Sequence, residues 1–448
     1  MPDPKTPTRV VILGAAGRDF HNFNMVYRDD PGSSVVAFTA AQIPNIAGRR
    51  YPPALAGARY QEGIPILDEG ELAELCRRER VAQVVFAYSD VDHARVMHAA
   101  SIALATGADF LLLGPERTML RACVPVIATS AVRTGCGKSQ TTRFLSRLLR
   151  DRGLRTAVIR HPMPYGDLAS EAVQRFASRA DLDAARCTVE EREEYEPHLA
   201  LGNVVYACVD YARIVARAER EADVILWDGG NNDFPFLRPD LHLVLIDPLR
   251  PGTETTHHPG EAVLRMADIV VVAKTNSAAE ADIRQVSDAA RRINPRATVV
   301  RAASPVALQD PARVHGRRVL VVEDCPTITH GGMPYGAGFV AATQAEAAEI
   351  VDPRPGAAPE IAAVYAQYPH IGPVLPAVGY SPQQLRALGE TIDAAAADVV
   401  VAATPADLAA LVPIRTPVVR VTYEFAEVGE PRLSDLVTDF LRRSTLFA

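Results

Sequence analysis

The residues of this chain best suited to chemistry lie in a glycine-rich run around Lys138 and Ser139. The apolar residues 125–132 before it predict a buried strand, and residues 143–150 after it have apolar side chains at helical spacing. Strand, glycine-rich turn, Lys-Ser and helix form a P-loop, which binds nucleoside triphosphate phosphates through backbone N–H groups and the lysine, and Mg²⁺ through the serine. The predicted nucleotide-binding residues here are Arg133, Thr134, Gly135, Cys136, Gly137, Lys138, Ser139 and Gln140.

The run departs from the usual P-loop pattern at one position. The pattern has its first glycine five residues before Gly137, and Val132 stands there in this chain. The alternative is an ordinary turn that contains Gly-Lys-Ser, but the strand and the helix on either side favour a P-loop.

A second pattern supports phosphoryl chemistry. The apolar residues 222–227 predict a strand that ends in Asp228, and an aspartate at that place holds Mg²⁺ together with the P-loop serine. We therefore predict Ser139 and Asp228 as metal ligands. The glycines and amides that follow predict a polar loop, in which Asn231 and Asn232 are candidates for substrate binding.

The base of the nucleotide is less well determined by the sequence. Ala273, Lys274, Thr275 and Asn276 follow a predicted strand where guanine-specific proteins carry Asn-Lys-x-Asp. The amide of Asn276 both donates and accepts hydrogen bonds, whereas the aspartate of that motif only accepts them. Lys274 and Asn276 are predicted nucleotide contacts, with ATP favoured and GTP left open.

Polar residues also follow the first strand of the chain. Residues 9–13 predict a strand, and a Gly-x-x-Gly turn separates it from Arg18, Asp19, His21 and Asn22. Such residues lie at the carboxyl edge of a parallel sheet, where α/β proteins bind ligands. We predict that they bind the substrate; the alternative is a tight turn with solvated side chains.

Two further loops contain candidate residues. Arg160 and His161 begin a Pro- and Gly-rich loop after a strand, and we predict that they contact the phosphoryl acceptor. Thr329 and His330 lie in a glycine-dense loop and are candidates for phosphate contact. In contrast, the acidic residues 188–196 are typical of a solvated helix face.

Composition limits the classes of function. The net charge of -7 argues against broad nucleic-acid binding, which needs a basic surface. The scattered cysteines, with no CxxC pair, argue against a disulfide framework or a zinc site and favour the cytoplasm. No stretch approaches the roughly 20 apolar residues of a membrane span. The expected partner is a small anionic substrate, and a homodimer is the expected assembly.

Alternating strands and helices predict an α/β protein. We expect an N-terminal Rossmann-like parallel sheet domain in residues 1–124 and a P-loop NTPase α/β domain in residues 125–448. The C-terminal part is predicted to extend the P-loop domain and to complete its sheet and site.

The runs 14–24, 133–139, 160–166 and 227–233 together resemble the cyclic 2,3-diphosphoglycerate synthetase-like family of P-loop proteins, a predicted GTPase family. The resemblance covers nearly the whole chain. It implies that ATP and Mg²⁺ are used to close an intramolecular phosphoanhydride in 2,3-diphosphoglycerate. The residues expected to carry that reaction are Lys138, Asp228, Arg160 and His161.

Other functions remain open from the sequence. A regulatory or metallochaperone-type GTPase would use the same P-loop as a switch. A kinase of another small phosphorylated molecule would also need the P-loop and the Asp228 loop.

Overall fold

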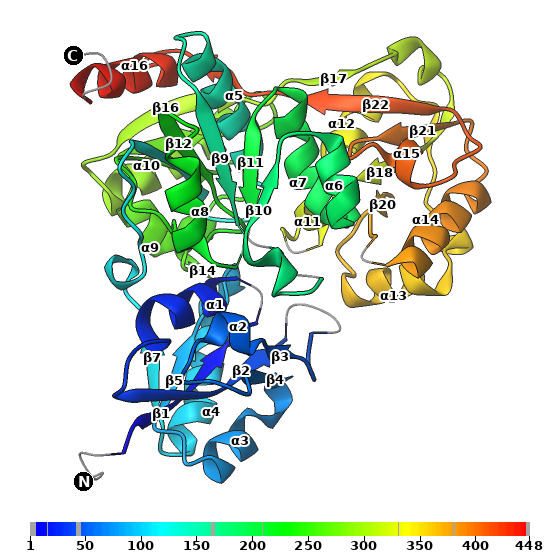
Figure 1. The fold of residues 1–448 in the computed structure, drawn as a ribbon. Helices are drawn as coiled ribbons and strands as arrows, with labels where there is room; N and C mark the ends of the chain where they lie inside the picture. The colour runs from blue at the N-terminus through cyan, green and yellow to red at the C-terminus, as the bar shows by residue number, and fades with distance from the viewer. Residues whose placement is uncertain are drawn as a thin grey trace.

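The computed structural model describes residues 6–15, 17–41, 46–161, 163, 166–207, 209–329, 331–379 and 381–444. The chain is an α/β protein, as predicted, and its strands form separate sheets in an N-terminal unit, a P-loop unit and a C-terminal unit. Figure 1 shows the N-terminal unit in blue below the green P-loop unit, with the C-terminal unit in yellow and orange beside it.

The N-terminal unit is a Rossmann-like sheet. Its strands are parallel except for β3, and their order is β3 (Arg50–Tyr51), β4 (Ile64–Asp68), β2 (Ser33–Ala40), β1 (Thr8–Leu13), β5 (Gln83–Phe86) and β7 (Asp109–Leu112). Its α-helices are α1 (Arg18–Asn22), α2 (Pro53–Ala56), α3 (Leu72–Arg78) and α4 (His93–Ala105). Strand β1 lies between β2 and β5, so the strand order of the parallel sheet reverses beside it, which is where such sheets bind ligands.

The P-loop unit has a parallel sheet with an antiparallel strand at each edge. The order is β10 (Gln174–Phe176), β11 (Val204–Ala207), β9 (Thr156–Arg160), β12 (Val224–Asp228), β8 (Val126–Ala131), β13 (Leu241–Ile246), β15 (Ile269–Val272), β16 (Thr298–Ala303) and β23 (Ala426–Val428). Its α-helices are α5 (Lys138–Arg150), α6 (Arg179–Ala185), α7 (Val189–Ala200), α8 (Tyr211–Ala218), α9 (Gly260–Arg265), α10 (Glu280–Ile293) and α16 (Leu433–Arg443).

The central strands of this sheet are buried on both faces. In β8, Ile127 and Ala131 pack into the core beneath α5, while Val126 and Ala128 pack into the core on the opposite face with Trp227. Because successive side chains of a strand point to opposite faces, a strand covered on both sides must be apolar throughout. Burying one large aliphatic side chain contributes about 1.5–3 kcal/mol, so these layers hold the strand ends firmly.

The C-terminal unit, residues 306–423, differs from the sequence prediction in forming a sheet of its own, whereas β23 beyond it joins the P-loop sheet as the prediction requires. Its strands are β17 (Val306–Leu308), β22 (Val418–Tyr423), β21 (Val399–Ala402), β18 (Arg318–Glu323) and β19 (Glu349–Ile350), with β20 (Leu375–Pro376) also paired to β18. Its α-helices are α11 (Cys325–Ile328), α12 (Ala337–Gln344), α13 (Pro359–Gln367), α14 (Pro382–Ala394) and α15 (Leu408–Leu411). Strand β23 occupies the edge of the P-loop sheet next to β16, which leaves that edge closed to β18.

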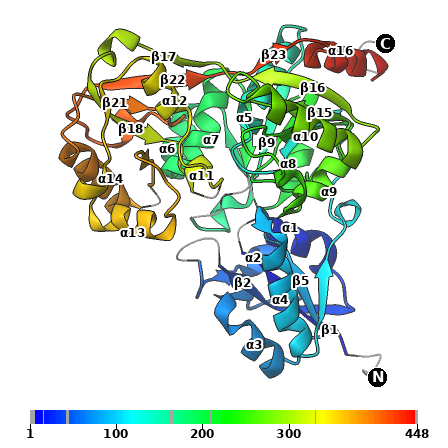
Figure 2. The same cartoon turned by 180° about the vertical axis from the view of Figure 1, so that it is seen from behind.

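The units are joined by short pairings. Strand β14 (His257–His258) of the P-loop unit pairs with β6 (Val91–Asp92) of the N-terminal unit. Figure 2 shows α9 at this junction and α16 at the opposite end of the P-loop unit. Within the described part of the chain, no helix has the length and apolar character needed to cross a membrane.

Candidate active site

A cavity of about 360 Å³ lies where the N-terminal, P-loop and C-terminal units meet. The carboxyl ends of the P-loop strands and the glycine-rich turn form its floor. The N-terminal unit contributes residues after β1, β2 and β5, including Asp19, Ala41 and Ser89. The C-terminal unit contributes residues that include Asp324 and Thr327.

The glycine-rich turn has the backbone of a phosphate-binding loop. Gly135 and Gly137 have φ angles of 79° and 106°, which L-residues with side chains rarely adopt. Gly137 caps the N-terminus of α5, which therefore directs its partial positive charge into the cavity. The ammonium of Lys138 lines the same cavity and donates to the backbone oxygen of Asn231, and burial lowers the pKa of this lysine.

Asp228, the predicted metal ligand, is fully buried at the end of β12. Its Oδ2 lies 2.5 Å from Nη1 of Arg160 and 3.0 Å from Nε2 of His198. Burial alone would raise the pKa of this carboxyl, but Arg160 and His198 outweigh it and the pKa is lowered, so Asp228 is ionised. Its Oδ1 is buried and has no hydrogen-bond partner among the described residues, which leaves one oxygen for a further ligand.

His198 acts as a neutral hydrogen-bond donor to this aspartate. Burial lowers the pKa of His198, so the imidazole is uncharged at neutral pH. The oxygen of the Asn203 amide accepts from Ser146, so its nitrogen donates to Nδ1 of His198. The proton of the imidazole is therefore on Nε2, which faces Asp228.

Helix α7 brings a carboxylate to the P-loop serine. The Ser139 hydroxyl donates to Oε2 of Glu194 over 3.3 Å and accepts from Nη1 of Arg160 over 3.3 Å. Arg160 also forms an ion pair with Glu194. Arg160 therefore lies between the carboxylates of Glu194 and Asp228, beside the site that ATP phosphates would occupy.

The same cavity has an acidic wall, which we define as Glu190, Glu194, Glu323 and Asp324. Burial raises the pKa of Glu323 to about 7, although backbone N–H groups of Gly336, Gly338 and Phe339 donate to its carboxylate. Burial also raises the pKa of Asp324 to about 6, against the effect of the Thr327 hydroxyl, which donates to it over 2.6 Å. Carboxylates that titrate near neutral pH mark a binding or catalytic surface.

Most of the residues predicted to bind the nucleotide line the cavity, whereas Arg133, Cys136 and Asn276 do not. Thr134, Gly135, Gly137, Lys138, Ser139, Gln140 and Lys274 line the cavity. Lys274 forms an ion pair with Asp247 at 2.8 Å. Cys136 is fully buried beneath the loop, where Arg250 contacts its sulfur, and burial raises the pKa of its thiol. Asn276 bonds the backbone of Ser304 beside the cavity, and Arg133 forms an ion pair with Asp90.

Among the predicted substrate residues of the N-terminal unit, the structure brings Arg18 and Asp19 to the cavity and His21 and Asn22 behind its wall. The Arg18 guanidinium is engaged at the unit junction, where its Nε lies 3.0 Å from Asp233. The Nε2–H group of His21 donates to the carbonyl of Thr118 over 2.6 Å, and burial lowers the pKa of the imidazole to about 3. A neutral, enclosed imidazole does not attract an anion, so the predicted role of His21 is not supported.

The remaining predicted residues also separate into two groups. Asn231 and His161 line the cavity, and burial lowers the pKa of His161 to about 3, so it is neutral. Asn232 is fully buried and bonds the backbone of Asp90 and Val132. Thr329 bonds the carbonyl of Cys325 inside its own helix end, which is a correction to its predicted contact with phosphate. His330 lies outside the described residues.

The acidic segment 188–196 was predicted to be a solvated helix face, and this prediction is wrong. Glu191, Glu193 and Glu196 are buried, while Glu190 and Glu194 line the cavity. The sequence offered one sign of this: Glu194 and His198 are four residues apart and therefore share one helix face.

The comparisons with known proteins identify the chain's relatives. No family model matches it. The protein described as arginine synthetase ArcE, from Thermococcus kodakarensis, is 54% identical over 438 residues, which cover 98% of this chain and 98% of that protein. The chain belongs to the ArcE family. It is an enzyme of the ligase or synthetase class, although the relative does not carry the cyclic 2,3-diphosphoglycerate synthetase name. The strand, glycine-rich turn and helix of the predicted P-loop are all present.

Solved structures overlap with the chain only in part. LpxK from Aquifex aeolicus, solved in complex with ATP, is 13% identical with a TM-score of 0.42 and covers 78% of this chain and 95% of its own. The hydrogenase maturation factor HypB from Archaeoglobus fulgidus is 13% identical with a TM-score of 0.24 and covers 40% of this chain and 79% of its own.

Proposed function

We propose that this protein is an ATP-dependent arginine synthetase. The observation that carries the proposal is a single cavity that has phosphate-binding cations on one side and the acidic wall on the other. Arginine carries a permanent guanidinium cation, and carboxylates bind guanidinium groups well. The relative named arginine synthetase, at 54% identity across almost the whole chain, supports the same substrate class.

Synthesis of arginine without a redox step needs a precursor that contains a carbon atom at the same oxidation state as the guanidinium carbon. A ureido amino acid, such as citrulline, meets this requirement. Its ureido oxygen attacks the γ-phosphoryl group of ATP, which forms a C–O–P linkage and releases ADP. An amine, ammonia in the simplest case, then adds to the carbon; the C–O bond breaks, inorganic phosphate leaves with that oxygen, and a proton is released.

The residues on the floor of the cavity suit the first step. Phosphoryl transfer requires mainly positioning and neutralisation of charge on the transferred oxygens. Lys138 and the N-terminus of α5 would bind the phosphates. Arg160 contacts Ser139 and Asp228 and would therefore lie near the γ-phosphoryl group. The neutral His161 lines the same cavity and would face the acceptor.

The residues present also fit a magnesium ion. Ser139, the free Oδ1 of Asp228 and the carboxylate of Glu194 are the oxygen ligands that Mg²⁺ prefers. In the described part of the chain, no group of three or more His, Cys, Asp or Glu residues is arranged to hold a metal ion, which agrees with a magnesium bound largely through ATP and water. When bound, it would neutralise charge on the β- and γ-phosphates.

The acidic wall is less suited to 2,3-diphosphoglycerate. That substrate carries several negative charges, and Glu190, Glu194 and Asp324 would repel it at close range. The basic groups expected to contact such an anion are Arg160 and His161, with Arg18 and His21 as a second set. Arg160 is paired with Glu194 and Asp228, Arg18 is paired with Asp233, and both imidazoles are neutral.

The experiment is an assay of product formation. The protein is incubated with Mg²⁺, ATP, citrulline and ammonium chloride, and arginine, ADP and phosphate are quantified. Equal amounts of the products, each dependent on citrulline, are expected. Arms with GTP, and with 2,3-diphosphoglycerate in place of citrulline, test the other readings. ATP turnover that is not increased by citrulline but is increased by 2,3-diphosphoglycerate would overturn the proposal.

A further inference from the structure

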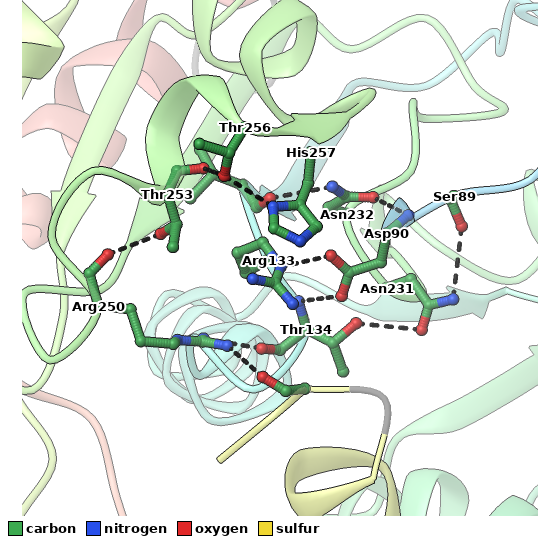
Figure 3. Close-up of polar contacts among 12 residues, drawn as sticks. Ser89, Asp90, Arg133, Thr134, Asn231, Asn232, Arg250, Thr253, Thr256 and His257 are labelled. Atoms are coloured by element: carbon green, nitrogen blue, oxygen red, sulfur yellow. Dashed lines mark hydrogen bonds and ion pairs between the residues drawn. The ribbon is translucent and has the colours of Figure 1, made fainter. Parts of the chain in front are cut away.

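The N-terminal unit holds the phosphate-binding loop directly through Asp90. Its Oδ1 accepts from Nε of Arg133 at 2.6 Å, and its Oδ2 accepts from the backbone N–H of Thr134 at 2.9 Å (Figure 3). The Asp90 side chain is 2% exposed. A carboxylate of one unit is therefore bonded to successive residues of the loop that belongs to another unit.

Hydrogen bonds to the backbone of Asp90 and pairing of the residues that follow it fix the direction of its carboxylate. The backbone N–H of Asp90 donates to Oδ1 of Asn232 at 2.7 Å and to the carbonyl of His258 at 2.9 Å. The next residues pair as β6 with β14. Asp90 itself has a φ angle of 56°, a left-handed conformation that aspartate and asparagine tolerate better than other residues with side chains.

This contact falls where the sequence of the loop is unusual. Val132, which replaces the first glycine of the usual pattern, is fully buried and continues the strand by donating to the carbonyl of Leu245 at 3.0 Å. Strand β8 ends at Ala131, the chain bends at Val132 and Arg133, and Thr134 with Gly135 forms the turn into the loop. Asp90 holds the start of this turn.

The charge of Asp90 does not work against phosphate binding, because Arg133 neutralises it at 2.6 Å. Figure 3 shows that Arg250 contacts the other side of the loop, where its Nη2 donates to the carbonyl of Thr134 at 2.8 Å. The peptide units around Thr134 are thus held by an anion on one side and by a cation on the other.

We propose that Asp90 is a positioning residue for ATP: from the N-terminal unit, it keeps the glycine-rich turn in the conformation that binds the phosphates. The inference rests on the ATP site of the proposed function. It does not require Asp90 to touch the nucleotide. It requires that loss of either bond to the carboxylate weakens ATP binding while the fold is retained.

The substitution Asp90→Asn separates these effects. Both carboxylate oxygens accept hydrogen bonds, whereas an amide has one acceptor and one donor group. Because Arg133 Nε and Thr134 N are both donors, the asparagine must lose one of the bonds. Asparagine keeps the size of the side chain and tolerates the left-handed backbone, so the fold is expected to be unchanged.

The matched control is Asp92→Asn. Asp92 lies two residues further along, is exposed, and caps α4 by accepting from the N–H of Arg95 at 2.8 Å. Asparagine caps helices as well as aspartate does, and the contacts of the Asp92 side chain are made within its own helix start. The two variants remove the same charge, but only the Asp90 side chain contacts the loop.

The measurement is calorimetric titration with the Mg²⁺ complex of the β,γ-imido analogue of ATP, together with thermal melting without nucleotide. Loss of a charge-assisted bond predicts a Kd about tenfold or more higher for D90N, with D92N within about twofold of the parent protein. In turnover, KM for ATP should rise more than kcat falls. Equal Kd values for D90N and D92N would overturn the inference. A parent protein that does not bind the analogue would instead overturn the proposed ATP site.

If D90N melts at a much lower temperature than D92N, Arg133→Met serves as the second variant. It removes the Arg133 bond and leaves the Thr134 bond to Asp90 in place. A raised Kd for the analogue, with the melting temperature of the parent, would support positioning through this pair. An unchanged Kd would contradict it.

Discussion

Arg160 and Asp228 are register partners on the neighbouring parallel strands β9 and β12, and their side chains form a buried ion pair of 2.5 Å. The sequence pattern of this site predicts Asp228 as a magnesium ligand, and the structure adds a cation that already shares its charge. Arg160 also contacts Glu194 and Ser139, so the pair connects the metal ligands, the acidic wall and the phosphate site. How well Asp228 is neutralised therefore depends on the cations beside it, whether Arg160 or a bound metal ion.

Replacement of Arg160 by Ala should therefore destabilise the protein. Asp228 would remain buried and charged with only His198 as a partner, and a broken buried pair of this kind costs about 3–5 kcal/mol. Added Mg²⁺ should recover part of this loss, because a cation beside Asp228 restores the neutralising charge. Urea unfolding with and without Mg²⁺ measures both effects. A variant as stable as the parent protein in metal-free buffer would contradict the prediction.

Lys138→Ala should abolish ATP turnover and leave the fold intact. The ammonium of Lys138 lines the cavity, and the backbone N–H groups of the loop do not carry its full positive charge. Removal of a group that stabilises transition-state charge lowers kcat by about 10²–10³-fold. Phosphate release in the presence of citrulline and ammonium measures activity, and circular dichroism during heating measures the fold. Retained turnover with native-like melting would refute the P-loop assignment for this site.

Binding of arginine should strengthen as pH rises through about 6. Burial raises the pKa of Asp324 from its ordinary value of 3.8 to about 6, so this part of the acidic wall is neutral at pH 5 and ionised at pH 7. A guanidinium ion gains attraction only from the ionised form. Competition by arginine against citrulline, measured from pH 5 to pH 8, should show this rise.

Asp324→Asn is the variant that tests the assignment, because it should flatten the pH dependence of arginine binding.

The pH dependence of folding stability has the opposite sign to that of arginine binding. A carboxyl whose pKa is raised in the folded state contributes stability that is complete below its unfolded pKa and is lost as pH rises through about 6. The D324N variant should therefore lose less stability than the parent protein between pH 4 and pH 7. The same pH slope of stability in both proteins would contradict the shift.

Ser89→Ala should reduce turnover by about two- to fivefold, as expected for loss of one neutral hydrogen bond. The Ser89 hydroxyl accepts from Asn231, whose amide oxygen accepts from Thr134 and whose backbone oxygen accepts from Lys138. A looser Asn231 positions Lys138 less well. Ser101→Ala is the control, since Ser101 is exposed on α4 and bonds only the carbonyl of Met97 there. Equal kcat values for both variants would contradict the prediction.

The parts of the site that depend on neighbouring residues could be predicted from the sequence. The strand ending at Ala131, the glycine turn and the helix from Lys138 form one continuous run, and so does the strand that ends in Asp228. Their local patterns determine both structure and chemistry. The same holds for the alternation that predicts parallel sheets, which the topology confirms.

The parts that depend on distant contacts could not be predicted in this way. Glutamates of α7 have the composition of a solvated helix, and only packing against the cavity distinguishes Glu194 from Glu219 or Glu221. Strand β18 has the same apolar pattern as β15. Its own residues therefore do not determine that it pairs with β21 and not with a strand of the P-loop sheet. Asp90 follows strand β5 closely in the sequence, but its partners Arg133 and Thr134 lie more than 40 positions away.

The closure of the P-loop sheet by β23 has a consequence for how the chain is assembled. The chain leaves this sheet after Ala303 and returns to it at Ala426, and these residues are register partners. Val306 and Tyr423 are partners just beyond them. Residues 306–423 are therefore an insertion whose entrance and exit lie side by side. A short turn could join these ends, which would leave the phosphate-binding unit whole while removing Glu323 and Asp324, and with them half of the acidic wall.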